Sequence, residues 1–280
     1  MMTSLIVNAD DYGLTAQVSA GIRHAHLHGI VTSTTVLVNA PGAAEAVQTA
    51  LRECPQLGLG LHLTLTCGAP LLPPERIPSL AAQTAGGRFP RLANLLAHAE
   101  TVNPRDVLAE WQAQVDAFIQ MSGRAPDHLD CHHHTAYFLP EWAQSMLQLA
   151  RGCGCGVRNP FTPAEDQPSI FADLPERLRQ RAAQVPALLA AASDVPQPQH
   201  FTSHFYERVS EDLLRTLTDH LPTGTSELMC HPGHVDDALR AVSSYSDLRE
   251  MELSLLSAPG LRRQLQQAGI RLCSFSALQP

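Results

Sequence analysis

Short apolar runs alternate with longer amphipathic stretches along the whole chain. This alternation is typical of β-α-β-α order, which builds a parallel sheet with helices outside it. The strands of such a sheet are covered on both faces, so they read as continuous apolar runs. We predict strands at Ser4–Ala9, Thr34–Asn39, Leu57–Leu65, His128–Cys131, Gly156–Arg158, His200–His204, Glu227–Cys230 and Ile270–Ser274.

Capping residues and prolines mark the helices between these strands. Thr15 is a suitable N-cap for a helix that ends before Gly29, and Asn103-Pro104 opens a helix to about Ser122. Leu139-Pro140 opens another. Repetition of the unit along the chain predicts an α/β fold, a deformed (β/α) barrel of the TIM type that is closed or nearly closed.

Two stretches interrupt the alternation, residues 68–90 and 159–175, because both are rich in proline and poor in helix or strand pattern. We interpret them as long loops at the C-terminal face of the barrel, where the active sites of such barrels lie. The chain shows no internal repeat and no domain boundary. Residues 1–280 are therefore expected to form one domain.

Charge and apolar content exclude several classes of protein. Lysine and arginine number 19 and the acidic residues 27, so the net charge is 19 − 27 = −8, and no basic run could follow a nucleic-acid backbone. The longest apolar stretches fall short of the roughly 20 residues that span a bilayer. A strand that starts almost at Met1 leaves no room for a secretion signal, so we expect a cytoplasmic protein. Seven cysteines without a C-x-x-C pair indicate neither a disulfide framework nor a structural zinc module.

Acidic residues and several of the 14 histidines stand at predicted strand ends. Asp10 and Asp11 follow the first strand, and a turn at Gly13 would bring both carboxylates toward one cavity. The simpler interpretation is an Asx turn, in which Asp11 caps the next helix. His62 lies inside an otherwise apolar strand, where it is either a metal ligand or a core histidine bonded to a carbonyl group.

The densest cluster, Asp127-His128-Leu129-Asp130-Cys131-His132-His133-His134, ends the fourth strand. In an extended chain His132 and His134 share a face with Asp130, an arrangement that suits a metal, although a solvated polar loop would explain it too. His231 precedes a Pro-Gly turn, either as a general acid or as a turn histidine bonded to the backbone.

His24 and His28 also have zinc-binding spacing, i and i+4 on a predicted helix. That helix lies outside the barrel, and no carboxylate joins the pair as it does in H-E-x-x-H enzymes. We therefore interpret them as surface histidines.

The coincidence of position carries more weight than any single motif. If the barrel forms, Asp10, Asp11, His62, His132 and His231 all lie at or near the C-terminal ends of strands. One carboxylate and two histidines would leave positions on a cation open for water and a substrate oxygen. The pattern predicts a mononuclear metal hydrolase, and oxygen with two nitrogens suits zinc without excluding other metals.

The same motifs, in order, carry a resemblance to a known family. They are Leu5-Ile6-Val7-Asn8-Ala9-Asp10-Asp11-Tyr12-Gly13-Leu14, Gly29-Ile30-Val31-Thr32-Ser33-Thr34-Thr35, Gly60-Leu61-His62, His128-Leu129-Asp130-Cys131-His132-His133-His134 and Met229-Cys230-His231-Pro232. From the first strand to the last, the chain resembles the YdjC-like carbohydrate deacetylases, and within them the chitooligosaccharide (chitobiose) deacetylase branch. The resemblance implies removal of the acetyl group from an N-acetylated amino sugar with release of acetate.

The resemblance also implies roles for individual residues. Asp11, His62 and His132 match the metal ligands, Asp10 the proposed general base and His231 the proposed general acid. It favours one Mg²⁺ ion, with Zn²⁺ as the alternative, and homodimers are frequent in the family.

Sugars present apolar C–H faces that pack on aromatic rings. The candidate substrate contacts are Tyr12, Asp130, His134, Tyr137, Phe205 and Tyr206, with Phe161 as a further aromatic. The family commonly carries a further histidine where this chain reads Thr135-Ala136-Tyr137-Phe138, so Tyr137 would replace a polar contact with a stacking face.

Three other functions compete with this one. The first is metal-dependent hydrolysis of another acylated glycan or of lipid-linked glucosamine. The second is a non-catalytic relative that binds metal or sugar, and the third is a glycosidase. The presence of both Asp10 and His231 argues against the non-catalytic relative. A glycosidase is disfavoured, because adjacent aspartates do not easily flank one bond at separations of roughly 5–9 Å.

Overall fold

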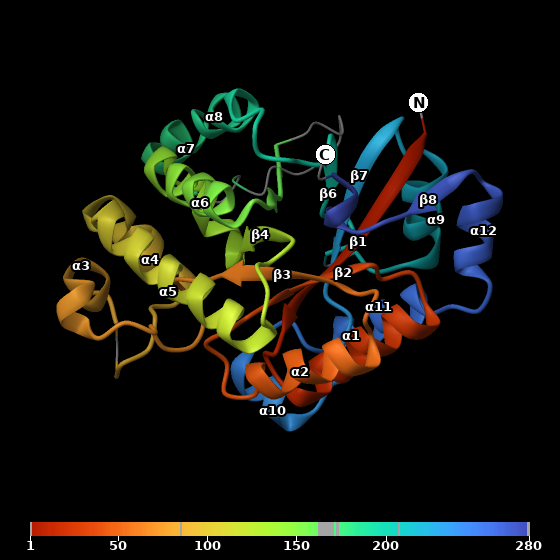
Figure 1. The fold of residues 1–280 in the computed structure, drawn as a ribbon, viewed down its shortest axis with the longest axis horizontal. Helices are drawn as coiled ribbons and strands as arrows, with labels where there is room; N and C mark the ends of the chain where they lie inside the picture. The colour runs from red at the N-terminus through yellow and green to blue at the C-terminus, as the bar shows by residue number, and fades with distance from the viewer. Residues whose placement is uncertain (1, 85, 162–170, 172–173, 207, 279–280) are drawn as a thin grey trace.

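Parallel strands form one curled sheet with helices around its outside (Figure 1) in the computed structural model, which describes residues 2–84, 86–161, 171, 174–206 and 208–278. The sheet order is β5-β4-β3-β2-β1-β7-β6, and β8 pairs with β1. Each predicted strand overlaps an observed one. The strands are β1 Thr3–Tyr12, β2 Ser33–Val36, β3 Gly58–Leu63, β4 His128–Cys131, β5 Gly156–Val157, β6 His200–Thr202, β7 Gly224–Cys230 and β8 Ile270–Leu272.

The sheet is a half-barrel, which confirms the deformed barrel but not its closure. β1 pairs with β7 over Thr3–Ala9, while β8 and β2 divide its other edge, at Thr3–Leu5 and Asn8–Tyr12. Since β8 joins β1 beside β2, it does not close a ring. Among the described residues no strand pairing joins β5 to β6, which are 2 and 3 residues long.

Helices cover the outside of the sheet (Figure 1). The predicted caps are confirmed: the Thr15 side chain accepts from the Val18 amide at the start of α1, and Asn103 accepts from the Arg105 amide at the start of α5. No described helix has the length and apolar content to cross a membrane. The α-helices are α1 Ala16–His28, α2 Ala43–Glu53, α3 Pro78–Ala81, α4 Leu92–His98, α5 Pro104–Ser122, α6 Pro140–Cys153, α7 Glu176–Ala182, α8 Val185–Ala191, α9 Glu211–Asp219, α10 Asp237–Val242, α11 Asp247–Leu256 and α12 Leu261–Gln267. The 3₁₀-helices are η1 Pro74–Arg76, η2 Ala99–Thr101, η3 His132–Tyr137 and η4 Phe275–Leu278.

The two stretches expected to be loops have different outcomes. Residues 68–90 contain η1 and α3, so the expectation of an unstructured connection is wrong there. Glu110 on α5 holds this segment, because its carboxylate accepts from the amides of Leu71 and Leu72 at 2.9 and 3.0 Å. Most of residues 159–175 lies outside the described residues, and the expected loop there stays a prediction.

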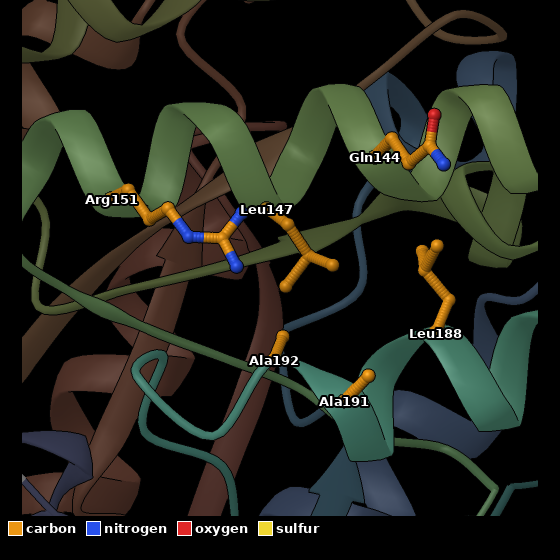
Figure 2. Close-up of a pocket in the computed structure, with 6 residues that line it drawn as sticks. All are labelled: Gln144, Leu147, Arg151, Leu188, Ala191 and Ala192. Carbon is orange, nitrogen blue, oxygen red and sulfur yellow. The ribbon is translucent and has the colours of Figure 1, made fainter.

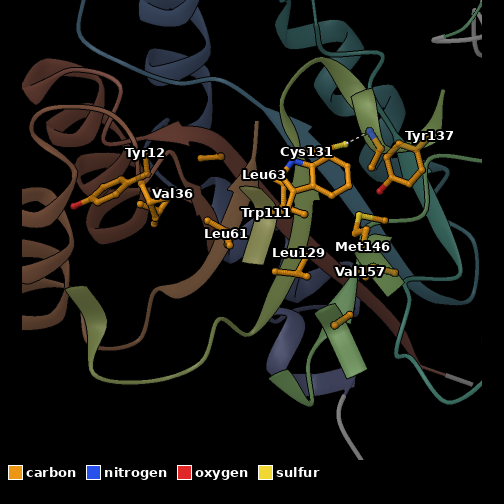
Figure 3. Close-up of a cluster of buried hydrophobic side chains, with 14 of the residues drawn as sticks. Tyr12, Val36, Leu61, Leu63, Trp111, Leu129, Cys131, Tyr137, Met146 and Val157 are labelled. Carbon is orange, nitrogen blue, oxygen red and sulfur yellow. Dashed lines mark hydrogen bonds between the residues drawn. The ribbon is translucent and has the colours of Figure 1, made fainter. Parts of the chain in front are cut away.

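The hydrophobic core packs between the sheet and its helices. Leu61 and Leu63 of β3 and Leu129 of β4 are fully buried, as are Trp111 on α5 and Met146 on α6 (Figure 3). Leu61, Leu63 and Leu129 point to one face of the sheet, whereas His62 and Asp130, which alternate with them, point to the other. The packing holds the C-terminal ends of β1, β3, β4 and β7 as the rigid base of a polar cluster.

Candidate active site

Asp10 and Asp11 end β1 where the strand is irregular. Between Ala9 and Tyr12 the chain advances three residues against two on β2, from Thr34 to Val36, so β1 carries one extra residue. Asp11 has a φ of 73°, a left-handed conformation that aspartate tolerates better than most residues. The bulge lies at Asp11 itself and directs both carboxylates toward His62, so the turn at Gly13 is not the sole cause.

Three candidate ligand atoms form a nearly equilateral triangle. His62 Nε2 lies 3.5 Å from Asp11 Oδ1, and His132 Nδ1 lies 3.2 Å from the same oxygen. The two ring nitrogens are 3.3 Å apart. Ligands at 2.0–2.2 Å around a tetrahedral ion stand about 3.4 Å from one another, so this spacing fits a zinc-sized tetrahedral site.

Asp130 orients His62 toward this triangle. Its Oδ1 lies 2.6 Å from His62 Nδ1, which leaves Nε2 facing Asp11. Its other oxygen accepts from Thr35 Oγ1 at 3.1 Å and from Arg158 at 2.9 Å. Histidines that bind metals commonly have such a carboxylate on the second ring nitrogen. We expected Asp130 to contact substrate, but the structure buries it completely behind His62.

The electrostatics of the cluster also fit a cation between Asp11 and His62. Asp11 Oδ1 is buried without a hydrogen-bond partner in the described part of the chain. Burial opposes the charged form of His62, but Asp130, Asp10 and Asp11 outweigh it and raise the pKa of His62 to about 9. When no cation is bound, a proton on His62 therefore provides the positive charge that balances these carboxylates. The residues present fit a divalent metal ion.

Arg158 holds Asp10 as an anion. Its guanidinium donates two hydrogen bonds to Asp10, at 2.7 and 2.8 Å, and Asn8 Nδ2 donates another at 2.8 Å. Burial opposes ionisation of Asp10, but Arg158 outweighs it and holds the pKa of that carboxyl well below its usual range. Arg158 also donates to the buried Glu227 at 2.8 Å, and burial raises the pKa of Glu227 to about 7.

His231 stands at the end of β7 on the other side of Asp10. Its Nε2 lies 4.0 Å from Asp10 Oδ2, and its side chain is 12% exposed. Its backbone amide donates to Glu252 at 2.5 Å, whereas among the described residues its buried Nδ1 has no hydrogen-bond partner. Burial lowers the pKa of His231 to about 4, so the ring is neutral at pH 7. The rings of Tyr206 and Tyr245 stack on each other at 4.5 Å, and both lie beside His231.

One side of α11 supports the site from behind. Arg249 and Glu252 lie on this helix, three residues apart, and Tyr245 comes two residues before its first residue, Asp247. Arg249 donates to Asp11 Oδ2, and Tyr245 donates to the carboxylate of Glu252. None of the three was predicted from the sequence, because no local pattern distinguishes them from exposed polar residues. Arg158 was not predicted either, although a charged residue at the end of a predicted strand was the signal that identified Asp10.

The histidine cluster is less regular than expected. The strand ends at Cys131, and His133 and His134 have positive φ angles of 55° and 56°, so the i, i+2, i+4 face does not form. His132 still reaches Asp11. His134 instead packs against Tyr137 and Phe201, with ring centres 6.2 and 6.1 Å away. His128 is a core histidine, stacked on Phe275 at 3.6 Å.

Three of the expected aromatic contacts lie in the core. The Tyr12 hydroxyl donates to the Ala46 carbonyl at 2.8 Å, and the Tyr137 hydroxyl donates to the Arg158 carbonyl at 2.7 Å. Tyr12, Tyr137 and Phe205 have no exposed surface to offer a sugar. Phe161 is partly buried against Tyr137. Tyr206 differs from these three, because it is 39% exposed and its ring lies 5.3 Å from that of His231.

A separate hollow lies between α6 and α8 (Figure 2). Its lining shares no residue with the cluster around Asp11. Its one charged residue, Arg151, is paired with Asp194 at 2.6 Å. The lining is Gln144, Leu147, Arg151, Leu188, Ala191 and Ala192.

Comparisons with known proteins agree on one family. The model of the family described as YdjC-like protein matches residues 4–267. A chitooligosaccharide deacetylase of Proteus mirabilis is 36% identical over 98% of this chain and 98% of that protein. A carbohydrate deacetylase of Enterococcus faecalis is 32% identical over 98% of this chain and 97% of that protein.

Solved structures agree with the fold. A crystal structure from Enterococcus faecalis, described provisionally as a cellobiose-phosphate cleavage protein, has a TM-score of 0.82 and 32% identity over 100% of both chains. A mutant CE4 family pseudoenzyme with restored activity has a TM-score of 0.51 at 8% identity, covering 100% of this chain and 68% of that one, and shares the fold alone.

Proposed function

We propose, given that this chain belongs to the YdjC-like protein family, that it is a carbohydrate deacetylase that uses a divalent metal ion. The observation that carries the proposal is the triangle of Asp11, His62 and His132 beside Asp10 and His231. An aspartate and two histidines next to an acid-base pair are suited to amide hydrolysis. The Proteus mirabilis relative supports an N-acetylated chitooligosaccharide as the substrate class.

Asp11, His62 and His132 would hold the metal ion. When bound, the ion would polarise the acetyl carbonyl and acidify a water molecule. Two imidazoles and one carboxylate favour a borderline ion such as Zn²⁺ over Mg²⁺, which prefers oxygen ligands. Asp130 would keep the Nε2 lone pair of His62 directed at the ion, and Arg249 would hold Asp11 in place.

The proton would travel from water to the departing amine through two residues. Asp10, kept anionic by Arg158, would accept it only transiently, because its pKa is so low. His231 Nε2 is 4.0 Å from Asp10 and is the more basic of the two groups, so it would receive the proton next. His231 would then protonate the amine nitrogen as the C–N bond breaks, releasing acetate and the free amino sugar.

The substrate would approach from the exposed side of His132 and His231. Tyr206, stacked on Tyr245, offers a ring face to an apolar side of the sugar at this opening. The homodimer and the cytoplasmic location expected from the sequence stay predictions.

Acetate release from diacetylchitobiose tests the proposal. We expect release from the purified protein, its loss on chelation, and its recovery with one or more of Zn²⁺, Co²⁺, Mn²⁺ and Mg²⁺. Asp11→Asn should lose both the bound metal and activity, whereas Asp10→Asn should keep the metal and lose about 10²–10⁴-fold in kcat.

Three outcomes would contradict it. Activity that survives complete chelation would remove the metal from the mechanism. No acetate from folded, metal-loaded protein would redirect the search to another acylated glycan or lipid-linked glucosamine. Retention of metal by Asp11→Asn would overturn the ligand assignment.

A further inference from the structure

Three imidazoles from two distant parts of the chain meet on the outer surface. His24 and His28 lie one turn apart on α1, with ring centres 4.6 Å apart. The segment after β7 brings the ring of His234 within 6.3 Å of His24. His24 and His28 are exposed, and the His234 side chain is 41% exposed, so all three can reach an ion in solution.

The backbone holds the two segments together. A Cβ added to Gly21 on α1 would lie only 2.6 Å from Gly233 Cα, so the two chains touch where glycine permits it. The amide of His234 donates to the Gln17 carbonyl at 3.3 Å. The backbone of His234 is therefore fixed beside α1.

The separations of the His24 ring from the other two rings are close to what a tetrahedral ion requires, and side-chain rotation has to bring the three ligand nitrogens together. Two histidines that bind one ion through nitrogens at 2.0–2.1 Å have ring centres about 5 Å apart. The His62 and His132 rings of the candidate active site are 5.3 Å apart. The surface separations of 4.6 and 6.3 Å lie on either side of that value, and exposed side chains change rotamer within nanoseconds.

A carboxylate orients His234 as Asp130 orients His62. Glu250 Oε1 lies 3.1 Å from His234 Nδ1, and Glu250 Oε2 accepts from the Val235 amide at 3.0 Å. Since Nδ1 is engaged, Nε2 of His234 is the nitrogen left for an ion. The carboxylate that the His24 and His28 pair lacks in sequence comes from α11, more than two hundred residues away, as the numbering shows.

We propose that His24, His28 and His234 form a second metal site, separate from Asp11, His62 and His132, with Glu250 orienting His234. Three imidazoles select a borderline ion such as Zn²⁺, Ni²⁺ or Cu²⁺ and reject Mg²⁺ and Ca²⁺. A bound ion would tie α1 to the segment that follows His231.

Zinc stoichiometry of the untagged full chain tests the site. Equilibrium dialysis against Zn²⁺ should give two equivalents per chain. His24→Ala and His28→Ala should each lose one equivalent and keep the other, while His62→Ala should lose the first and keep the second. Glu250→Gln, which retains an acceptor for the Val235 amide, should weaken the second equivalent about 10–100-fold.

The control is His98→Ala, which removes an exposed histidine on α4 and should leave both equivalents in place. Co²⁺ at the second site should add a visible absorption band of tetrahedral type that His28→Ala removes. A zinc stoichiometry that is the same in the wild-type chain and in the His24→Ala variant would overturn the proposal. So would a second equivalent that survives in the His24→Ala/His28→Ala double variant. Neither result depends on deacetylase activity, so the surface site and the proposed function fail independently.

Discussion

Two buried carboxylates in this molecule have opposite surroundings. Glu110, on α5, accepts from the amides of Leu71 and Leu72 and from Gln114 Nε2, all within 3.0 Å, so both its oxygens are satisfied by neutral donors. Asp11 accepts from Arg249 on one oxygen, whereas its other oxygen is buried beside two imidazoles with no hydrogen-bond partner among the described residues.

The difference separates a structural carboxylate from a functional one. Glu110 closes a network that fastens residues 68–90 to α5, and burial raises its pKa. The pKa of Asp11 lies well below its usual range, because Arg249, His132 and His62 outweigh burial. A buried acceptor atom without a hydrogen bond lowers the stability of the fold unless a bound ligand or ion interacts with it. Burial alone therefore does not identify a site. What distinguishes Asp11 is a buried carboxylate oxygen without a hydrogen-bond partner among the described residues that lies beside two imidazole nitrogens.

The largest effect should come from removing the buried positive charge of Arg158, which contacts three buried carboxylates beside the candidate site. Arg158→Met would leave Asp10, Asp130 and Glu227 without their buried partner, and we expect a loss of about 3–5 kcal/mol of unfolding free energy in urea. Arg158→Lys keeps a charge but not the bidentate contact, so it should lose less and fold if Arg158→Met does not. Unchanged stability in both variants would show that the guanidinium is not needed structurally.

A smaller effect is expected at Arg249, which donates to the proposed metal ligand Asp11. Arg249→Lys keeps the charge but loses the guanidinium contact with Asp11. Metal affinity, measured by competition with a chelator, should fall about 10–100-fold. Equal metal affinity in the variant and the wild type would mean that the hydrogen bond from Arg249 to Asp11 does not contribute to metal binding.

Glu110→Gln tests the carboxylate whose two oxygens both accept hydrogen bonds from neutral donors. The amide has one acceptor fewer, so the Leu72 amide loses its partner, and we expect a cost of about 1–3 kcal/mol in unfolding free energy. The kcat for acetate release should be unchanged in the folded, metal-loaded enzyme. A large fall in kcat would make residues 68–90 part of the catalytic machinery and weaken the distinction drawn above.

Tyr206→Ala should give the smallest effect. Unlike Glu110→Gln, it should change substrate binding and leave the stability of the protein unchanged. Stacking of this kind contributes about 0.5–1.5 kcal/mol, so KM for a chitooligosaccharide should rise roughly 2- to 13-fold with the same urea midpoint. A Tyr206→Phe variant keeps the ring and should behave like the wild type. A change in stability without a change in KM would place Tyr206 in the core rather than the substrate site.

Much of the architecture was predictable, because the signals are local. Apolar runs predicted the strands, and the caps at Thr15 and Asn103 formed as expected. The structure also brings Asp10, Asp11, His62, His132 and His231 together, since parallel strands end at one edge of the sheet. Closure of the barrel was not predictable from these signals, because it depends on whether the edge strands β5 and β6 meet, and among the described residues they do not pair.

The sequence by itself therefore determined the order of the strands along the chain and the polar residues at their ends, because both follow from the periodicity of neighbouring residues. Only the tertiary structure decided which charges meet. Arg158 reaches Asp10 across 148 residues and Arg249 reaches Asp11 across 238. It also turned Tyr12 into the core and placed Glu250 beside His234. Such contacts depend on how distant elements pack against one another, and no local period in a chain records that.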